Sequence, residues 1–258
     1  MNTNKQFEHR EDINPDDYVE VEEIIKQYIP KENEIHVQEF DDIIKFYNLK
    51  RGDILLSEGF GYFIDNAIKF FTKCFITHVM LVQEYKGEFY VIESTIQMGI
   101  DKYPDYIHKK IKSGPMMVPF KKRFETYRGI IFVRPISKRL PDSYGDLIHE
   151  FYKGASEFKY ETNYIELFNC FMKINRGNKT TTGPYFCSEL IAEIFQSIGL
   201  LKPPKYGGIS SEYYSPEDWI NVPLLSGCGY TLGKPRFILP PLEYLEERNL
   251  KLKMEGYQ

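Results

Sequence analysis

Cys187 is the residue of this sequence that is best placed for covalent chemistry. It lies near the start of a predicted amphipathic helix, and counting back three residues from Leu190 or four from Ile191 on the apolar face returns to Cys187. The thiol is therefore expected to point inward from the first helical turn. Because a helix N-terminus carries partial positive charge and unpaired N–H groups, it stabilises a negatively charged sulfur. The alternative is that Cys187 is a small buried hydrophobic residue.

His78 and Glu93 form a second candidate group. Residues 78–82 and 88–94 are predicted strands, and Lys86-Gly87 between them suits the two-residue turn of an antiparallel hairpin. In that register, His78 and Glu93 are diagonal neighbours on one face, within side-chain reach. A carboxylate there would hold the imidazole in one tautomer and leave its other nitrogen for a nucleophile. The alternative is a satisfied polar pair at the rim of a sheet.

A cysteine at a helix start and a histidine–carboxylate pair are together the components of a cysteine acyl-transfer site. Motifs of other chemistries are missing, since the sequence has no HExxH, no GxGxxG after a strand and no GxSxG. We therefore expect neither a metal nor an organic cofactor. Two short basic runs, residues 108–110 and 121–123, are interpreted as solvated surface. Arg51-Gly52-Asp53 spells an adhesion tripeptide, but the apolar residues after it favour the start of a strand.

Composition and charge disfavour several classes of protein. The chain of 258 residues has 33 Lys and Arg against 37 Asp and Glu, which disfavours a protein that binds nucleic acid by neutralising phosphates. A hydrophobic fraction of 42% is typical of a globular protein. Four cysteines without a CxxC pair do not make a disulfide framework. Neither a signal-peptide core nor an apolar run long enough for a membrane span is found, so we expect a cytoplasmic or virion-associated protein.

The order of predicted elements indicates an α+β fold rather than an alternating parallel one. Apolar spacing predicts helices over residues 18–29, 40–47, 62–71, 104–112, 142–155, 161–174, 184–198 and 242–250. Strands are predicted over residues 53–56, 78–82, 88–94 and 129–134. We therefore expect a small antiparallel sheet or half-barrel, with the Cys187 helix packed against it.

The order of four short motifs resembles a known family. They are Arg51-Gly52-Asp53-Ile54-Leu55-Leu56, Thr77-His78-Val79, Ile92-Glu93-Ser94-Thr95 with Gly99 shortly after, and Phe186-Cys187-Ser188-Glu189-Leu190-Ile191. This set looks like the circularly permuted branch of the NlpC/P60 papain-like superfamily, which includes bacterial permuted amidase-like proteins and relatives in large DNA viruses. In that branch the histidine strand precedes the cysteine helix, as here, whereas papain and ordinary NlpC/P60 enzymes have the reverse order. The resemblance covers roughly residues 50–200.

The resemblance implies a cysteine hydrolase with a papain-like fold. Carried over to this chain, Cys187 would be the nucleophile, His78 the general base and later the acid, and Glu93 the residue that orients His78. The substrate would be an amide, ester or thioester, cleaved through an acyl-enzyme on Cys187. The backbone N–H of Cys187 would stabilise the oxyanion, because it lies at the helix start.

Two other functions stay open at this point. Related papain-like branches make a lipid acyltransferase or lipase an alternative, and a non-catalytic structural or binding protein could retain the fold. The expected partner is a small-molecule, peptide or lipid substrate, and the oligomeric state is left open. We expect an N-terminal tail and helical extension over residues 1–49, a catalytic domain over residues 50–200, and a C-terminal extension over residues 201–258 that packs on it.

Overall fold

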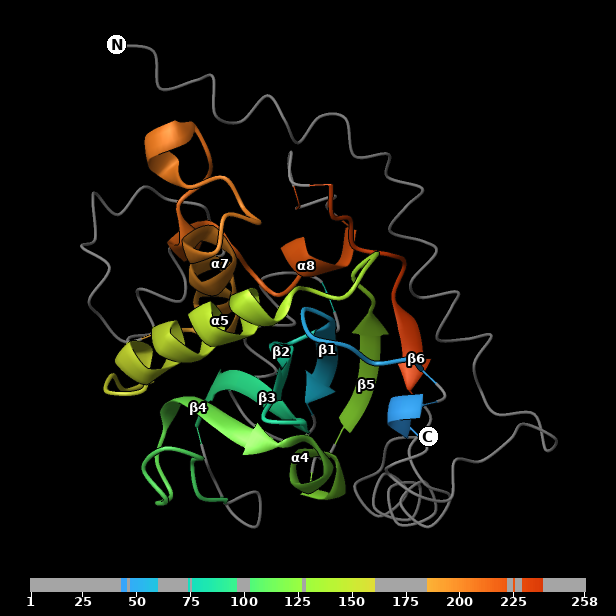
Figure 1. Ribbon diagram of the computed structural model, residues 1–258, viewed down its shortest axis with the longest axis vertical. Coiled ribbons are helices and arrows are strands. Elements are labelled where there is room, and N and C mark those ends of the chain that lie inside the picture. The colour runs from blue at the N-terminus through green and yellow to red at the C-terminus, as the bar shows by residue number, and fades with distance from the viewer. Residues whose placement is uncertain are drawn as a thin grey trace, which may run out of the picture. The chain divides into compact units, whose positions relative to one another are not determined.

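The described part of the protein is built on an antiparallel sheet. The computed structural model describes residues 43–45, 47–59, 74, 76–96, 103–126, 129–160, 185–221, 225 and 229–238. The sheet has six strands in the order β4-β3-β2-β1-β5-β6 (Figure 1). Their bounds are β1 (Ile54–Gly59), β2 (His78–Tyr85), β3 (Glu88–Thr95), β4 (Gly114–Pro119), β5 (Gly129–Arg134) and β6 (Arg236–Ile238). All neighbouring pairs are antiparallel, which confirms the predicted α+β class with an antiparallel sheet.

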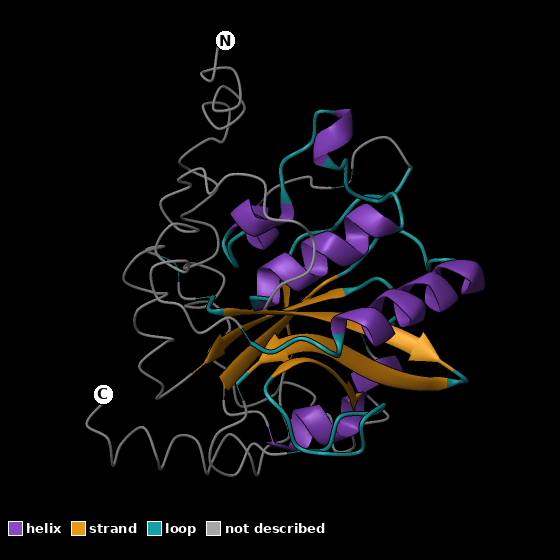
Figure 2. Cartoon of the chain, turned by 90° about the vertical axis from the view of Figure 1, so that its left-hand side faces the viewer, coloured by secondary structure: helices purple, strands orange, loops and turns teal. Residues whose placement is uncertain are grey.

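Helices cover both faces of this sheet (Figure 2). On one face, α7 (Cys187–Ser197) packs on β2 and β3, and α5 (Asp142–Ala155) packs on β2, β4 and α7. On the other face lies α4 (Phe120–Thr126). The remaining short elements are two 3₁₀ helices, Pro204–Tyr206 and Ser211–Tyr213, and α8 (Asp218–Asn221). No helix among the described residues is long and apolar enough to cross a membrane.

Strand alternation divides the core between the two faces, because successive side chains point to opposite sides of a sheet. One cluster joins Met80 and Val91 of the sheet to Phe120 and Phe124 of α4. The strand residues of the opposite parity are also buried, and they face the side of α5 and α7: Ile54, Leu56, Val79, Leu81 and Ile92. The sheet is therefore covered by apolar side chains on both faces, which fixes its position between α4 and the pair α5 and α7.

The hairpin of β2 and β3 has the turn that the sequence predicts. Lys86 and Gly87 have φ angles of 54° and 79°, and positive φ at both central residues defines a type I′ turn. The register pairs Tyr85 with Glu88 and continues without interruption to Leu81 and Ile92. A bulge that would turn side chains to the other face is therefore missing from this paired stretch, and the predicted alternation holds along the hairpin.

Two predicted helices are present close to their expected bounds. α5 coincides with residues 142–155, whereas α7 begins at Cys187, three residues later than the sequence suggests. The preceding Phe186 has extended backbone, with φ −75° and ψ 163°, and it forms the N-cap. Gly199 follows the end of α7 with φ 77°, the left-handed conformation that commonly closes helices. Cys187 is thus the first residue of its helix.

The helix predicted over residues 104–112 is wrong. The Asp105 carboxylate accepts hydrogen bonds from the backbone N–H groups of Ile107 and His108, at 3.1 and 2.9 Å, and so forms a local turn. Lys109 then adopts φ 52°, which ends that turn. The other carboxylate oxygen of Asp105 accepts the N–H of Met117 in β4 at 3.0 Å. These bonds to one buried carboxylate replace the helical ladder.

Some elements lie beyond what the sequence patterns predict or what the structure describes. β4 and α4 are not predicted, because Pro115 and Pro119 interrupt the apolar run; prolines are tolerated here since β4 is an edge strand. The predicted helices over residues 18–29, 62–71, 161–174 and 242–250 lie outside the described residues. Of the helix predicted over residues 40–47, residues 43–45 are helical. The predicted domain boundaries stay a prediction.

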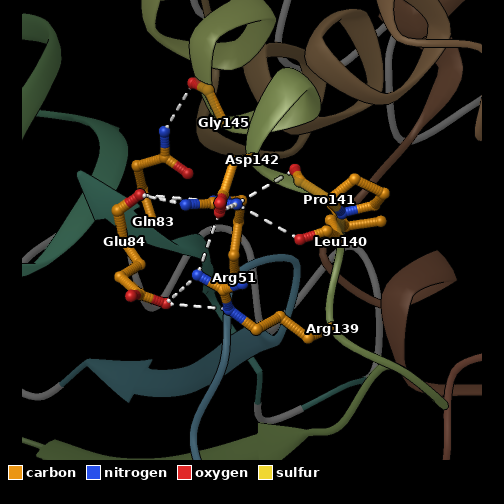
Figure 3. A network of polar contacts seen from close by, with 8 residues as sticks. All are labelled: Arg51, Gln83, Glu84, Arg139, Leu140, Pro141, Asp142 and Gly145. Atoms are coloured by element: carbon orange, nitrogen blue, oxygen red, sulfur yellow. Dashed lines mark hydrogen bonds and ion pairs between the residues drawn. The ribbon is translucent and has the colours of Figure 1, made fainter. Parts of the chain in front are cut away.

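Arg51 joins the β2–β3 hairpin to the start of α5 (Figure 3). Its buried guanidinium donates hydrogen bonds to the backbone oxygens of Glu84, Leu140 and Pro141 at 2.9–3.2 Å, and to the Asp142 carboxylate at 2.9 Å. Gly145 of α5 lies against the same guanidinium, and a Cβ there would be 2.7 Å from two of its atoms. A glycine inside this helix therefore makes room for Arg51.

The tripeptide Arg51-Gly52-Asp53 leads into β1, as the sequence predicts, and it is not available to a partner. Arg51 and Asp53 are both buried. The Asp53 carboxylate accepts the N–H groups of Lys50 and Ile136 at 2.9 and 2.8 Å. These contacts tie the start of β1 to the segment that follows β5, so the charged residues of this tripeptide have a structural role.

Candidate active site

His78 and Glu93 lie at the same end of the β2–β3 hairpin. His78 is the first residue of β2 and Glu93 is near the end of β3, so the antiparallel register brings them together. Nε2 of His78 is 2.7 Å from Oε2 of Glu93. The Glu93 side chain is fully buried, and 13% of the His78 side chain is exposed. The predicted diagonal contact is therefore present, and it leaves Nδ1 of His78 for another group.

Cys187 reaches this pair from the first turn of α7. The start of α7 is held at the end of β3, where the Ser94 hydroxyl donates a hydrogen bond to the Tyr185 carbonyl at 2.7 Å. Cys187 is 4% exposed, and its side chain shares a hydrogen bond with His78. The structure thus brings the three predicted site residues into one chain of contacts, Cys187–His78–Glu93. They come from α7, β2 and β3.

The charge state of His78 follows from two opposing effects. Burial disfavours the imidazolium because it removes water from the charged ring. The negative charge on the Cys187 sulfur and the hydrogen bonds with Cys187 and Glu93 outweigh burial, and the pKa of His78 is raised from 6.5 to about 9. The protonated His78 ring therefore lies between the Glu93 carboxylate and the Cys187 side chain, where it could stabilise a negative charge on the sulfur.

Arg123 is a second cation that holds Glu93 as a carboxylate. Burial would raise the pKa of Glu93, but the positive charges and hydrogen bonds of Arg123 and His78 lower it below the ordinary value of 4.5. Arg123 Nε lies 2.8 Å from Oε1, and Arg123 Nη2 donates to Oε2 at 2.8 Å. Nη2 therefore makes a hydrogen bond with Glu93, whereas Nε contacts Oε1 as an ion pair without hydrogen-bond geometry.

Arg123 is the component of this site that the sequence patterns missed. The basic run of residues 121–123 is interpreted above as solvated surface, and that interpretation is wrong for its last member. Lys121 and Lys122 are exposed, whereas Arg123 is 4% exposed. The sequence spacing could have indicated that Arg123 is buried, because Phe120 lies three residues before it and Phe124 directly after it. Both phenylalanines pack into the core, so the same face of α4 carries Arg123 inward.

The side chains of the site suit thiol chemistry. Within the part of the chain that the structure describes, no group of three or more His, Cys, Asp or Glu side chains could hold a metal ion. Both nitrogens of His78 and the oxygens of Glu93 are engaged with charged neighbours. The arrangement can hold a thiolate, keep a proton beside it, and stabilise that proton with a fixed negative charge.

Comparison with known proteins assigns no family to this chain. No family model and no curated protein matches the sequence. Among solved structures, the fold is similar to the crystal structure of the metalloprotein YiiX from Escherichia coli O157:H7 (DUF1105), with a TM-score of 0.42 and 14% sequence identity. That similarity covers 73% of this chain and 96% of the YiiX chain. A likeness of this degree transfers no property of YiiX to this chain.

Proposed function

We propose that the protein is a cysteine hydrolase of the circularly permuted papain-like (NlpC/P60) class, which cleaves an amide, ester or thioester through an acyl-enzyme on Cys187. The observation that carries the proposal is the position of His78, which contacts the Cys187 side chain on one side and the buried Glu93 carboxylate on the other. The order of the chain also supports this class, since the histidine strand precedes the cysteine helix.

Acylation begins with the Cys187 thiolate. The sulfur attacks the substrate carbonyl carbon, a C–S bond forms, and the electron pair of the C=O bond moves to the oxygen. The backbone N–H of Cys187 is at the first position of α7, where N–H groups have no partner within the helix, so it would donate to this oxyanion. His78 then gives its proton to the departing nitrogen, oxygen or sulfur, and the bond to the leaving group breaks.

Deacylation reverses these roles. Neutral His78 accepts a proton from water as the water oxygen attacks the acyl carbon, and the C–S bond breaks to release the acid. The thiolate and the imidazolium are then restored. Glu93 acts throughout by fixing the ring of His78 and by stabilising its positive charge, as the buried carboxylate of a hydrolase triad does.

Activity profiling tests this function. The wild-type protein, Cys187→Ala and Cys74→Ala are assayed against a panel of amides, esters and thioesters, and intact mass reports an acyl adduct. Cys74 is a partly exposed cysteine that is not in a disulfide, so its variant is the matched control. We expect Cys187→Ala to lose roughly 10³-fold or more of the wild-type rate and to form no adduct, whereas Cys74→Ala keeps both.

Two outcomes of the same assay would change the assignment. Hydrolysis that survives in Cys187→Ala would contradict the proposal, because the acyl-enzyme would then have no sulfur on which to form. Transfer of the acyl group to an added amine or alcohol in preference to water would make the protein an acyltransferase with the same first step.

A further inference from the structure

We propose that Arg123 is a positioning residue of the Cys187–His78–Glu93 site, which fixes the Glu93 carboxylate in the plane from which it holds His78. This inference rests on the proposed function, because it assigns a role within the same site. The contacts that place Arg123 in this site are with Glu93 and Tyr103, and it acts on His78 through Glu93. Three features carry the inference: how Arg123 is itself held, how it holds Glu93, and how it balances the buried charge.

Contacts other than those with Glu93 hold Arg123 in place. Phe120 and Phe124 anchor α4 in the core, and their rings stack with centroids 4.5 Å apart. The guanidinium carbon of Arg123 lies 5.3 Å from the ring centre of Tyr103, and Nη1 donates a hydrogen bond to the Tyr103 hydroxyl. Tyr103 is fully buried. Arg123 therefore has a defined orientation, and a side chain so constrained can orient a neighbour.

The contact of Arg123 with Glu93 sets the plane of the carboxylate. Nη2 donates a hydrogen bond to Oε2 and Nε lies in ion-pair contact with Oε1, both at 2.8 Å, so rotation of the carboxyl group would lengthen one of the two contacts. Oε2 is also the atom that lies 2.7 Å from Nε2 of His78. The planar guanidinium contacts both carboxylate oxygens at once, whereas a lysine ammonium acts as a point charge. The direction of the hydrogen bond with His78 therefore depends on the Arg123 fork.

Arg123 also balances the charge of the site. When Cys187 is ionised, four charges of alternating sign follow one another from α7 to α4: the thiolate of Cys187, the imidazolium of His78, the carboxylate of Glu93 and the guanidinium of Arg123. Their sum is zero. Without Arg123 the buried site would carry one net negative charge, so Glu93 would take up a proton more readily and the thiolate would be less stabilised. The Tyr103 hydroxyl, an uncharged group, accepts a hydrogen bond from Arg123 at the end of this series.

The test compares Arg123→Gln, which removes charge and fork, with Arg123→Lys, which keeps the charge alone. Arg134→Lys is the matched control, because Arg134 is another buried arginine, which donates to the backbone oxygens of Trp219 and Gly233. The alkylation rate of Cys187 by iodoacetamide is measured by mass spectrometry across pH 4 to 10 in protein that circular dichroism shows to be folded.

We expect the acid limb of the alkylation profile to move up by about one pH unit or more in Arg123→Gln, because a neighbouring charge of opposite sign is lost. Arg123→Lys should keep the wild-type acid limb and lower the maximal rate by roughly three- to tenfold, because the charge remains and the fork is lost. Arg134→Lys should change neither. A wild-type profile in folded Arg123→Gln would overturn the inference; if that variant does not fold, a wild-type maximal rate in Arg123→Lys would overturn it.

A second measurement separates this inference from the proposed function. The ¹³C resonance of the Glu93 carboxyl group, assigned by its loss in Glu93→Gln, reports protonation of Glu93 without any reaction at Cys187. In the wild-type protein it should titrate below the ordinary value of 4.5, and in Arg123→Gln about one pH unit or more higher. This shift together with an unreactive wild-type Cys187 would refute the hydrolase and support the coupling of Arg123 to Glu93. An unshifted Glu93 titration would overturn the role of Arg123.

Discussion

Replacement of Gly145 by alanine tests whether Arg51 is locked between the hairpin and α5. An alanine Cβ at this position would be 2.7 Å from both Cζ and Nε of Arg51, closer than any ordinary contact. The end of an arginine side chain is usually flexible and would move aside. Here it is held by hydrogen bonds to three backbone oxygens and to the Asp142 carboxylate, so a displacement must weaken several of them (Figure 3).

The size of the effect follows from two opposing contributions. Alanine is favoured over glycine within a helix by about 1 kcal/mol. Hydrogen bonds from a charged group contribute about 1.5–3 kcal/mol each, so weakening one or two of those made by Arg51 outweighs that gain. We expect Gly145→Ala to lower the free energy of unfolding by about 1–4 kcal/mol. Gly154→Ala is the matched control on the same helix, since a Cβ there meets nothing within 4 Å, and it should raise stability by about 1 kcal/mol.

Urea and thermal unfolding, followed by far-UV circular dichroism, measure both variants. A change of 1 kcal/mol corresponds to about 2–4 °C in Tm for a domain of this size, so the two variants should move in opposite directions by resolvable amounts. Arg51→Leu removes the obstacle, and in that background Gly145→Ala should no longer destabilise the protein. Equal stabilities of Gly145→Ala and Gly154→Ala would refute the reasoning, because Arg51 would then be free to move.

Three further predictions concern the candidate site. By NMR, the His78 ring should titrate near pH 9 in the wild-type protein and at lower pH in Cys187→Ala. The substitution removes the charge and the hydrogen bond that raise the pKa of His78. Equal pKa values of His78 in the two proteins would exclude the contact with Cys187. This pKa of about 9 lies above the unfolded value of 6.5, so protonated His78 stabilises the folded state. Its contribution to the free energy of unfolding should be complete below pH 6.5 and should be lost as the pH rises to about 9. Urea unfolding of the wild-type protein and of His78→Gln across this pH range measures that contribution. Glu93→Gln should slow alkylation of Cys187 by roughly tenfold or more, because it removes the negative charge that stabilises the His78 imidazolium. It should also destabilise the fold by about 3–5 kcal/mol, because Arg123 stays buried without its carboxylate partner. An unchanged alkylation rate would mean that another group orients His78.

The parts of the site that the sequence predicts are those governed by local rules. A two-residue turn at Lys86-Gly87 determines the register of the hairpin, and the register alone places His78 diagonal to Glu93. The apolar spacing of the last described long helix likewise places Cys187 inward on its first turn. Each of these inferences needs only the geometry of one strand pair or one helix.

The parts that the sequence does not predict depend on contacts between distant segments. Asp105 replaces a predicted helix with a turn because its carboxylate is also bound by Met117 in a neighbouring strand. Arg123 is buried because α4 folds onto the face of the sheet that carries Glu93, and a run of three basic residues does not reveal that position. Long-range hydrogen bonds of this kind override local preference, so they are found only once the strands are placed.

The order of strands has a consequence for how the protein is made on the ribosome. β1, β2, β3 and β4 are neighbours in the sheet in the same order as in the chain, so these four can pair through local connections as they are synthesised. His78 and Glu93 belong to this early segment, whereas Cys187 arrives only with α7, after β5 and α5. The nascent chain therefore contains the base and its carboxylate before the thiol is synthesised. We expect the reactive sulfur to be the last of the three groups to appear, which shortens the time during which an activated cysteine is present in an unfinished protein.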